Sequence, residues 1–399
     1  GRVPGWGWAL IIVAAVVLVA VPATLGVLLW ARGGNAPTTD APATGAAPDD
    51  VPTPSPTTTA PDAQDDGGGF GDLLEGLLGG MDPVALAQCI GVPEVAPEPL
   101  PEDPEAAVDV IADQVADERG LAFTDPVDPD LLAPADLADR VVELSAEDYP
   151  ADVADVDARL LTALGAIPPG TDLRQLQLDL LGGQVAGFYD PDTGELTAVA
   201  TDGLDPTARI TLAHELDHAL VDQAIGLPDL DGFAGRSDEG LATLAVIEGD
   251  ASLLMQRWSV AQLSVLDQLA AAGASLGPAN QLQSVPWVLQ QQLVFPYTAG
   301  LELACQQFVD GGWDAVDALY ATPPTTSAQV LWPERLAAGE AAVDVPDPQL
   351  PGDRWQEARR DQLGAADLLW LFQAPGDDRD AALRSPEDRA RAWAGGLEQ

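Results

Sequence analysis

Leu212–Gln223, LAHELDHALVDQ, contains both histidines of this 399-residue chain, His214 and His218. Side chains four positions apart on an α-helix differ by about 40° in direction, so both imidazoles can reach one metal ion. Glu215 follows the first histidine, which completes the HExxH pattern of a zinc site with a general base. The alternative is a helix with two incidental histidines, but such spacing arises by chance on the order of once in a few thousand sequences.

The flanking residues predict a helix from Pro206 to Ile225. Asp205 and Pro206 suit the N-cap and first helical position, and Gly226 suits the end. Apolar residues cover most of the circumference, which favours a buried central helix. Buried imidazoles need partners, and a metal ion supplies them.

A catalytic zinc ion takes three protein ligands and one water. A metzincin would carry Gly at position 221 and His at position 224, where this chain has Val221 and Ala224. The third ligand is therefore expected to be a carboxylate or a thiolate.

The next predicted helix, Ser237–Trp258, supplies the third ligand. Glu248 lies four residues after Leu244, on the apolar face, where a lone carboxylate is costly unless it binds something. We predict Glu248 as the third ligand. The alternatives that remain open are Asp238, Glu239 and Asp250.

With zinc on these residues, Glu215 is predicted to act as general base for a water that attacks a carbonyl. The donor that stabilises the oxyanion is expected to be Tyr189, Tyr297 or an arginine, because both histidines are ligands. Asp222 and Asp250 are predicted to support a ligand imidazole. These roles describe hydrolysis of a peptide bond.

The composition excludes one class of partner. Acidic residues number 64 against 17 basic ones, for a formal charge of −47. Such a surface repels nucleic acid, so we predict no nucleic-acid partner. The two cysteines, Cys89 and Cys305, are too few for a disulfide framework. One bridge and two unpaired buried thiols are both consistent with the sequence.

The N-terminal segment is predicted to anchor the chain in a membrane. Residues 1–32 contain an uncharged run from Trp8 to Trp30, about 35 Å long as a helix and enough to cross a bilayer. Its length and the lack of a small-residue cleavage site argue against a signal peptide. Residues 33–69, rich in Pro, Thr and Asp, are predicted to be a disordered linker. Residues 70–104 are expected to form a short helix, 70–81, and a Pro/Glu-rich connector.

Residues 105–399 are predicted to form one mainly helical α+β domain. Around DPDTG, alternating runs predict a hairpin with strands Val185–Tyr189 and Glu195–Thr201, and its first strand could pair with an extended peptide. Apolar residues at three and four spacing predict the other elements as helices. These are Ala106–Glu118, Ala135–Leu144, Val153–Leu164, Thr171–Leu181, Ala261–Ala272, Pro286–Val294, Leu301–Phe308, Trp313–Tyr320, Asp353–Phe372 and Ser385–Trp393.

The chain resembles a family of bacterial zincin-like metallopeptidases of gluzincin type. The resemblance rests on GFYDPDTGEL (187–196), LAHELDHALVDQ, AVIEGDA (245–251), VFPYTAGLE (294–302) and GGWDAVDALYATPPTTSAQVLWPERL (311–336). It implies zinc on His214, His218 and Glu248, with Glu215 catalytic. It also implies that PPTTSAQVLWPE is a structural or cleft-lining loop, in which Trp332 replaces a histidine common in the family. By the same resemblance the last residues, RARAWAGGLEQ, lead into a further strand, so we expect sequence beyond this end.

The leading hypothesis is a membrane-anchored zinc peptidase whose catalytic domain faces the cell exterior and acts on peptides or proteins. A catalytically silent zincin domain, serving as a binding or scaffold module on a membrane stalk, is the alternative. Structural zinc is disfavoured because neither cysteine lies near the motif.

Overall fold

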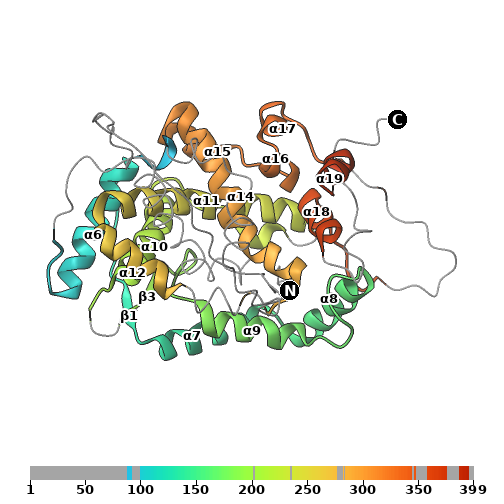
Figure 1. Ribbon diagram of the computed structural model, residues 1–399, viewed down its shortest axis with the longest axis horizontal. Helices are drawn as coiled ribbons and strands as arrows, with labels where there is room; N and C mark the ends of the chain where they lie inside the picture. The colour runs from blue at the N-terminus through green and yellow to red at the C-terminus, as the bar shows by residue number, and fades with distance from the viewer. Residues whose placement is uncertain are drawn as a thin grey trace, which may run out of the picture.

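The computed structural model describes residues 88–91, 99–200, 203–233, 236–275, 282, 284–343, 346, 357–374 and 386–394. These form a mainly helical α+β structure, as the sequence predicts, and it contains a small three-stranded sheet (Figure 1). The predicted span at 8–30, the linker at 33–69 and the helix at 70–81 lie outside these ranges. Within them, no helix combines the length and apolarity needed to cross a membrane.

Three helices form the centre of the structure: α10 (Pro206–Ala224), α11 (Ser237–Gln262) and α14 (Trp287–Gly311). As predicted, Asp205 caps α10 by accepting a hydrogen bond from the Ala208 N–H at 2.8 Å, with Pro206 in the first turn. Every residue of α10 from Ile210 to Val221 is buried. The predicted central helix is therefore confirmed.

Helices α11 and α14 touch backbone to backbone. A Cβ atom built on Gly249 would lie 2.3 Å from the Gly300 carbonyl group, and one on Gly300 would lie 2.2 Å from the Ala245 oxygen. Side chains larger than hydrogen cannot fit there, so these two glycines set the depth of the crossing. In Figure 1 the orange α14 runs diagonally across the yellow-green α11.

The sheet lies against α10. The predicted hairpin is confirmed, with antiparallel strands β2 (Gly187–Asp190) and β3 (Glu195–Val199). A third strand that the sequence did not reveal, β1 (Asp130–Leu132), pairs in parallel with β3, so β2 lies at an edge of the described sheet. Gly187 lets β2 approach α10, because a Cβ there would lie 2.7 Å from Thr211 Cγ2 and 3.2 Å from Glu215 Cγ.

The remaining elements surround this centre. On the N-terminal side they are α6 (Pro104–Arg119), α7 (Pro134–Asp148), α8 (Ala151–Ala163) and α9 (Leu173–Gln184). The later ones are the 3-10 helix η1 (Leu230–Phe233), α12 (Val265–Ala274), α15 (Trp313–Ala321), α16 (Ser327–Leu331), α17 (Pro333–Ala337), α18 (Ala365–Gln373) and α19 (Pro386–Ala394). The loop implied by the family resemblance, 323–334, thus contains the short helix α16 and the start of α17.

One predicted break is absent. The sequence predicts separate helices before and after Pro296, whereas α14 runs through it. An interior proline costs about 3 kcal/mol because it removes a backbone hydrogen bond and crowds the preceding turn. Its neighbours Phe295 and Tyr297 are buried in two different core clusters, and this packing offsets the cost.

Two other predicted helices have wrong boundaries. Instead of a helix from Ala261, α11 continues to Gln262, and Ser264 then caps α12 by accepting from the Asp267 N–H. Residues 357–364 of the predicted helix Asp353–Phe372 are not helical. There Arg359 bonds Asp157 and Asp361, and these tertiary contacts replace the helix that local periodicity predicted.

Cys89 and Cys305 form a disulfide, with 5.4 Å between their Cα atoms. The bridge joins the start of the described chain to α14 across a sequence separation of 216 residues. In the entropic model such a bridge contributes about 5 kcal/mol. Arg257 of α11 also donates a hydrogen bond to the Cys89 carbonyl. The segment around Cys89 is therefore joined to α14 by a covalent bond and to α11 by a hydrogen bond.

The crossing of α11 and α14 can be tested with alanine. Gly300→Ala should lower the free energy of unfolding by about 3 kcal/mol or more, because the added methyl group overlaps backbone that cannot move aside. Gly273→Ala in α12 is the matched control, since a Cβ there has no neighbour within 4 Å. It should leave stability unchanged or raise it by up to about 1 kcal/mol. Equal denaturation midpoints for the two variants would contradict the backbone contact.

Candidate metal centre

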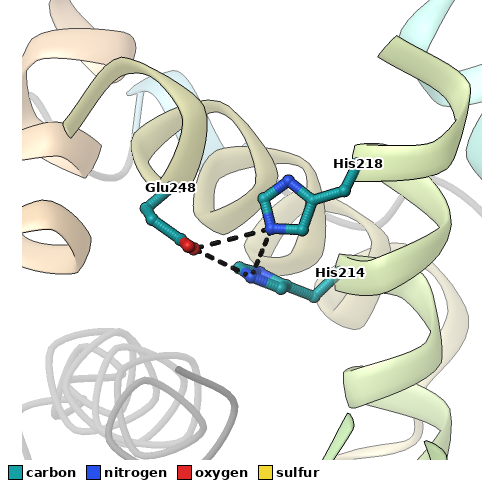
Figure 2. Close-up of side chains that lie close together, drawn as sticks. All are labelled: His214, His218 and Glu248. Carbon is teal, nitrogen blue, oxygen red and sulfur yellow. Dashed lines mark hydrogen bonds and ion pairs between the residues drawn. The ribbon is translucent and has the colours of Figure 1, made fainter. Parts of the chain in front are cut away.

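Two ligand helices bring three side chains together. His214 and His218 point from α10 towards Glu248 on α11, as Figure 2 shows. The distances from Glu248 Oε2 to the two Nε2 atoms are 3.2 Å for His214 and 3.5 Å for His218, and the two Nε2 atoms lie 3.1 Å apart. The three side chains expose at most 2% of their surface. The structure thus assembles the three residues that the sequence predicts.

This donor set could hold a metal ion. Ligands placed tetrahedrally at about 2.0–2.2 Å from an ion lie about 3.3–3.6 Å from one another, close to the observed separations. Glu248 Oε1 has no hydrogen-bond partner among the described residues and is free to bind an ion. Although burial opposes its charge, His218 and His214 hold the pKa of Glu248 below its ordinary value. The arrangement therefore fits a cation better than three uncharged groups.

The competing carboxylates have other partners. Asp238 accepts from the Ser327 N–H at 3.1 Å, and Glu239 pairs with Arg236 at 2.6 Å. Asp250 accepts from Tyr320 Oη and from Arg119, at 2.9 Å each. Glu248 is therefore the carboxylate that meets both histidines.

The side chain of Glu215, which belongs to α10, lies between that helix and strand β2. It is 1% exposed, and the Tyr189 backbone N–H of β2 donates a hydrogen bond towards it. Burial raises the pKa of Glu215 to about 8, the charge of His214 opposes this shift, and Glu248 adds to it. Its second oxygen, Oε2, has no partner in the described part of the chain and is available to a water molecule.

The two candidate tyrosines occupy different positions. Tyr297 is 1% exposed, its ring centroid lies 6.3 Å from that of His214, and its hydroxyl donates to Glu248. Burial, followed by the charges of Glu248 and Glu215, raises its pKa well above the ordinary value. Tyr189 instead donates to Asp222 at 2.8 Å. The structure thus places only Tyr297 of this pair with its hydroxyl on a ligand.

The predicted support of an imidazole by Asp222 or Asp250 is not found. The hydrogen bonds to Asp222 come from Tyr189 and from the Leu227 N–H, and those to Asp250 come from Arg119 and Tyr320. Neither carboxylate is bonded to a histidine within the described ranges. Asp250 follows Glu248 by two residues, which places it about 200° around the helix, on another face.

The sequence did not indicate that Arg119 is a buried cation near this centre. Arg119, the last residue of α6, is 1% exposed and contacts Asp250 of α11 and Asp317 of α15. In sequence it looks like an ordinary basic residue in a last helical turn, where solvent exposure is the rule. Its burial depends on how α6, α11 and α15 pack.

No protein-family model matches this chain, and comparisons with curated proteins and with solved structures gave no match. The resemblance to the zincin-like family therefore stays a prediction that rests on the quoted motifs.

Metal content tests the centre directly. We expect one zinc ion per chain, lost on dialysis of His214→Ala and Glu248→Gln and retained by Glu215→Gln. Removing a ligand should weaken metal binding more than removing a group that is hydrogen-bonded to a ligand, which costs about 10–100-fold in affinity. Elemental analysis and competition with a chromophoric chelator measure both quantities. A chelator should also lower the melting temperature of the wild type, because bound metal stabilises the folded state. Full zinc occupancy in Glu248→Gln would exclude this residue as a ligand.

Proposed function

We propose that this chain is a membrane-anchored, zinc-dependent metallopeptidase of gluzincin type. The observation that carries the proposal is the convergence of His214, His218 and Glu248 within 4.8 Å, with Glu215 beside them on α10. Two histidines and a glutamate are the ligand set of open catalytic zinc sites, which leave a fourth position for water or substrate. Structural sites are usually closed by cysteine, and both cysteines here are in the disulfide.

Zinc is favoured by the donor types. Imidazole suits zinc and several transition ions, whereas magnesium and calcium prefer oxygen-only sites. When bound, the ion supplies a Lewis acid that lowers the pKa of water and polarises the scissile carbonyl.

Glu215 moves the protons in this mechanism. Its unpartnered Oε2 accepts a proton from the attacking water and later delivers it to the leaving amine. The hydrogen bond from the Tyr189 N–H holds the other side of the carboxylate in place. Burial favours the protonated form of Glu215, whereas a bound cation would favour the carboxylate, so the side chain can act first as base and then as acid.

Tyr297 and strand β2 position the substrate. Tyr297 releases its hydrogen bond to Glu248 and donates it to the oxyanion as charge develops there. Strand β2 lies at an edge of the described sheet, and its outward backbone groups other than the Tyr189 N–H can bind an extended peptide by strand addition. A peptide bound along this edge passes the proton acceptor.

The disulfide supports an exterior location. Such bonds persist in oxidising compartments and are rare in the cytosol. Together with the apolar run at 8–30, the bridge favours a domain held outside the cell by an N-terminal anchor.

Burial favours a second candidate function. His214, Glu215, His218 and Glu248 each expose no more than 2% of their surface, so a peptide reaches them only if part of the surrounding protein moves. A catalytically silent zincin domain that serves as a binding or scaffold module needs no such opening. The intact Glu215 argues for activity, because a silent module has no use for a general base.

Glu215→Gln separates the two functions. With the full chain and a mixed peptide library, the wild type should cleave and Glu215→Gln should lose about 10²–10⁴-fold in rate while it keeps zinc, because the amide cannot accept the proton. Mass spectrometry of the products detects the cleavage. A wild type that holds zinc but leaves every peptide intact would favour the silent module.

Tyr297→Phe tests the oxyanion donor. We expect kcat to fall by about 10²–10³-fold with little change in KM, because the hydroxyl acts mainly in the transition state. Tyr189→Phe is the matched comparison, since its hydroxyl is bonded to Asp222, and it should lose less. A larger loss of kcat in Tyr189→Phe than in Tyr297→Phe would identify Tyr189 as the oxyanion donor instead.

A further inference from the structure

Arg119 is a fully buried cation that contacts both ligand helices. Its side chain has no solvent exposure, and its Nη2 lies 2.9 Å from Asp250 Oδ2 on α11. Its Nε lies 3.7 Å from Asp217 Oδ1 on α10, and the Asp217 side chain is 1% exposed. Asp217 immediately precedes the ligand His218, and Asp250 lies two residues after the ligand Glu248. One guanidinium group therefore connects the two helices close to their metal ligands.

The guanidinium is held from several sides. Its carbon lies 4.4 Å from the centroid of the Trp313 ring, and Nη2 also pairs with Asp317 on α15. Tyr320 Oη donates to the same Asp250 oxygen at 2.9 Å. Gly120, with φ of 72°, ends α6 directly after Arg119 and fixes where the side chain starts. Nη2 makes both hydrogen bonds, Nε makes only the ion-pair contact with Asp217, and the Trp313 ring covers one face, so the contacts restrict the group from three directions.

The charges make Arg119 the necessary partner. Neither carboxylate oxygen of Asp217 accepts a hydrogen bond within the described ranges. Arg119 forms an ion pair with Asp217 and another with Asp250. Although burial alone would lower it, the carboxylates of Asp250 and Asp217 raise the pKa of Arg119 above its ordinary value. Without the guanidinium, two carboxylates would be buried together next to the ligands, and α10 and α11 would move to separate them or admit water.

We propose that Arg119 is a positioning residue for the metal centre: by bridging Asp217 and Asp250 it fixes the separation of α10 and α11, and thereby the distance between the histidine nitrogens and Glu248. A metal site tolerates ligand displacements of only about 0.5 Å, so small shifts of one helix against the other change its affinity. The inference rests on the metal site of the proposed function and not on the hydrolysis.

Metal binding by the full chain tests this role. Arg119→Met should weaken zinc binding by about 10–100-fold, as loss of an outer-shell partner does. It should also change the visible absorption of the cobalt-substituted protein, which reports ligand geometry. Arg119→Lys keeps the charge but not the fork, and should fall between wild type and Arg119→Met. If Arg119→Met fails to fold, Asp217→Asn and Asp250→Asn, which keep side-chain shape, should show the same two changes.

Asp317→Asn is the matched control. Asp317 also pairs with Arg119, but it lies on α15, which carries no ligand, and its side chain is 29% exposed. This variant should keep the zinc affinity and the cobalt spectrum of the wild type even if its melting temperature falls. Equal losses in Asp317→Asn and Asp217→Asn, or folded Arg119 and Asp217 variants with wild-type affinity and spectrum, would overturn the proposal.

The two proposals fail in different ways. A wild type that binds zinc but cleaves no peptide contradicts the proposed activity and leaves the role of Arg119 intact, because metal affinity is the readout here. A wild type that binds neither zinc nor cobalt would overturn both.

Discussion

The burial of two imidazoles and a carboxylate at one point is the constraint on which the rest of the structure depends. His214, His218 and Glu248 lie in a region without solvent, where unpaired polar groups cost several kcal/mol. Their partners are one another, Tyr297 and, in the proposed state, a metal ion. The helices that carry them, α10 and α11, must therefore keep a fixed separation, and both are buried along most of their length.

Glycine sets how closely the elements approach this point. Gly249 directly follows Glu248, and its contact with Gly300 brings α14 close enough for Tyr297 to reach the same glutamate. On the other side of α10, Gly187 lets strand β2 lie against Thr211 and Glu215. At these positions the missing side chain determines the geometry of the candidate centre, because a methyl group would move the helix or strand beside it.

The comparison of Arg119 with Glu248 shows where sequence reasoning succeeds. Glu248 was recognisable because a carboxylate on an apolar helical face contradicts the local pattern and needs a partner. Arg119 agreed with its local pattern, since a basic residue suits the last turn of a helix. Its importance arises from Asp217, Asp250 and Asp317, which are about 100–200 residues away in sequence. Rules based on local patterns cannot detect such a partner set.

Local signals along the chain were enough to predict the capped helix α10 with its histidines four apart, the hairpin around its turn, and the mainly helical class. It also identified the three side chains of the candidate centre, because helical periodicity and polarity are properties of neighbouring residues. Tertiary contacts determine the continuity of α14 through Pro296, the pairing of β1 with β3, the disulfide, and the placement of the Tyr297 hydroxyl, rather than that of Tyr189, at Glu248. The physical reason is that each of these depends on contacts between distant segments, whose packing energy outweighs the local preference of the chain.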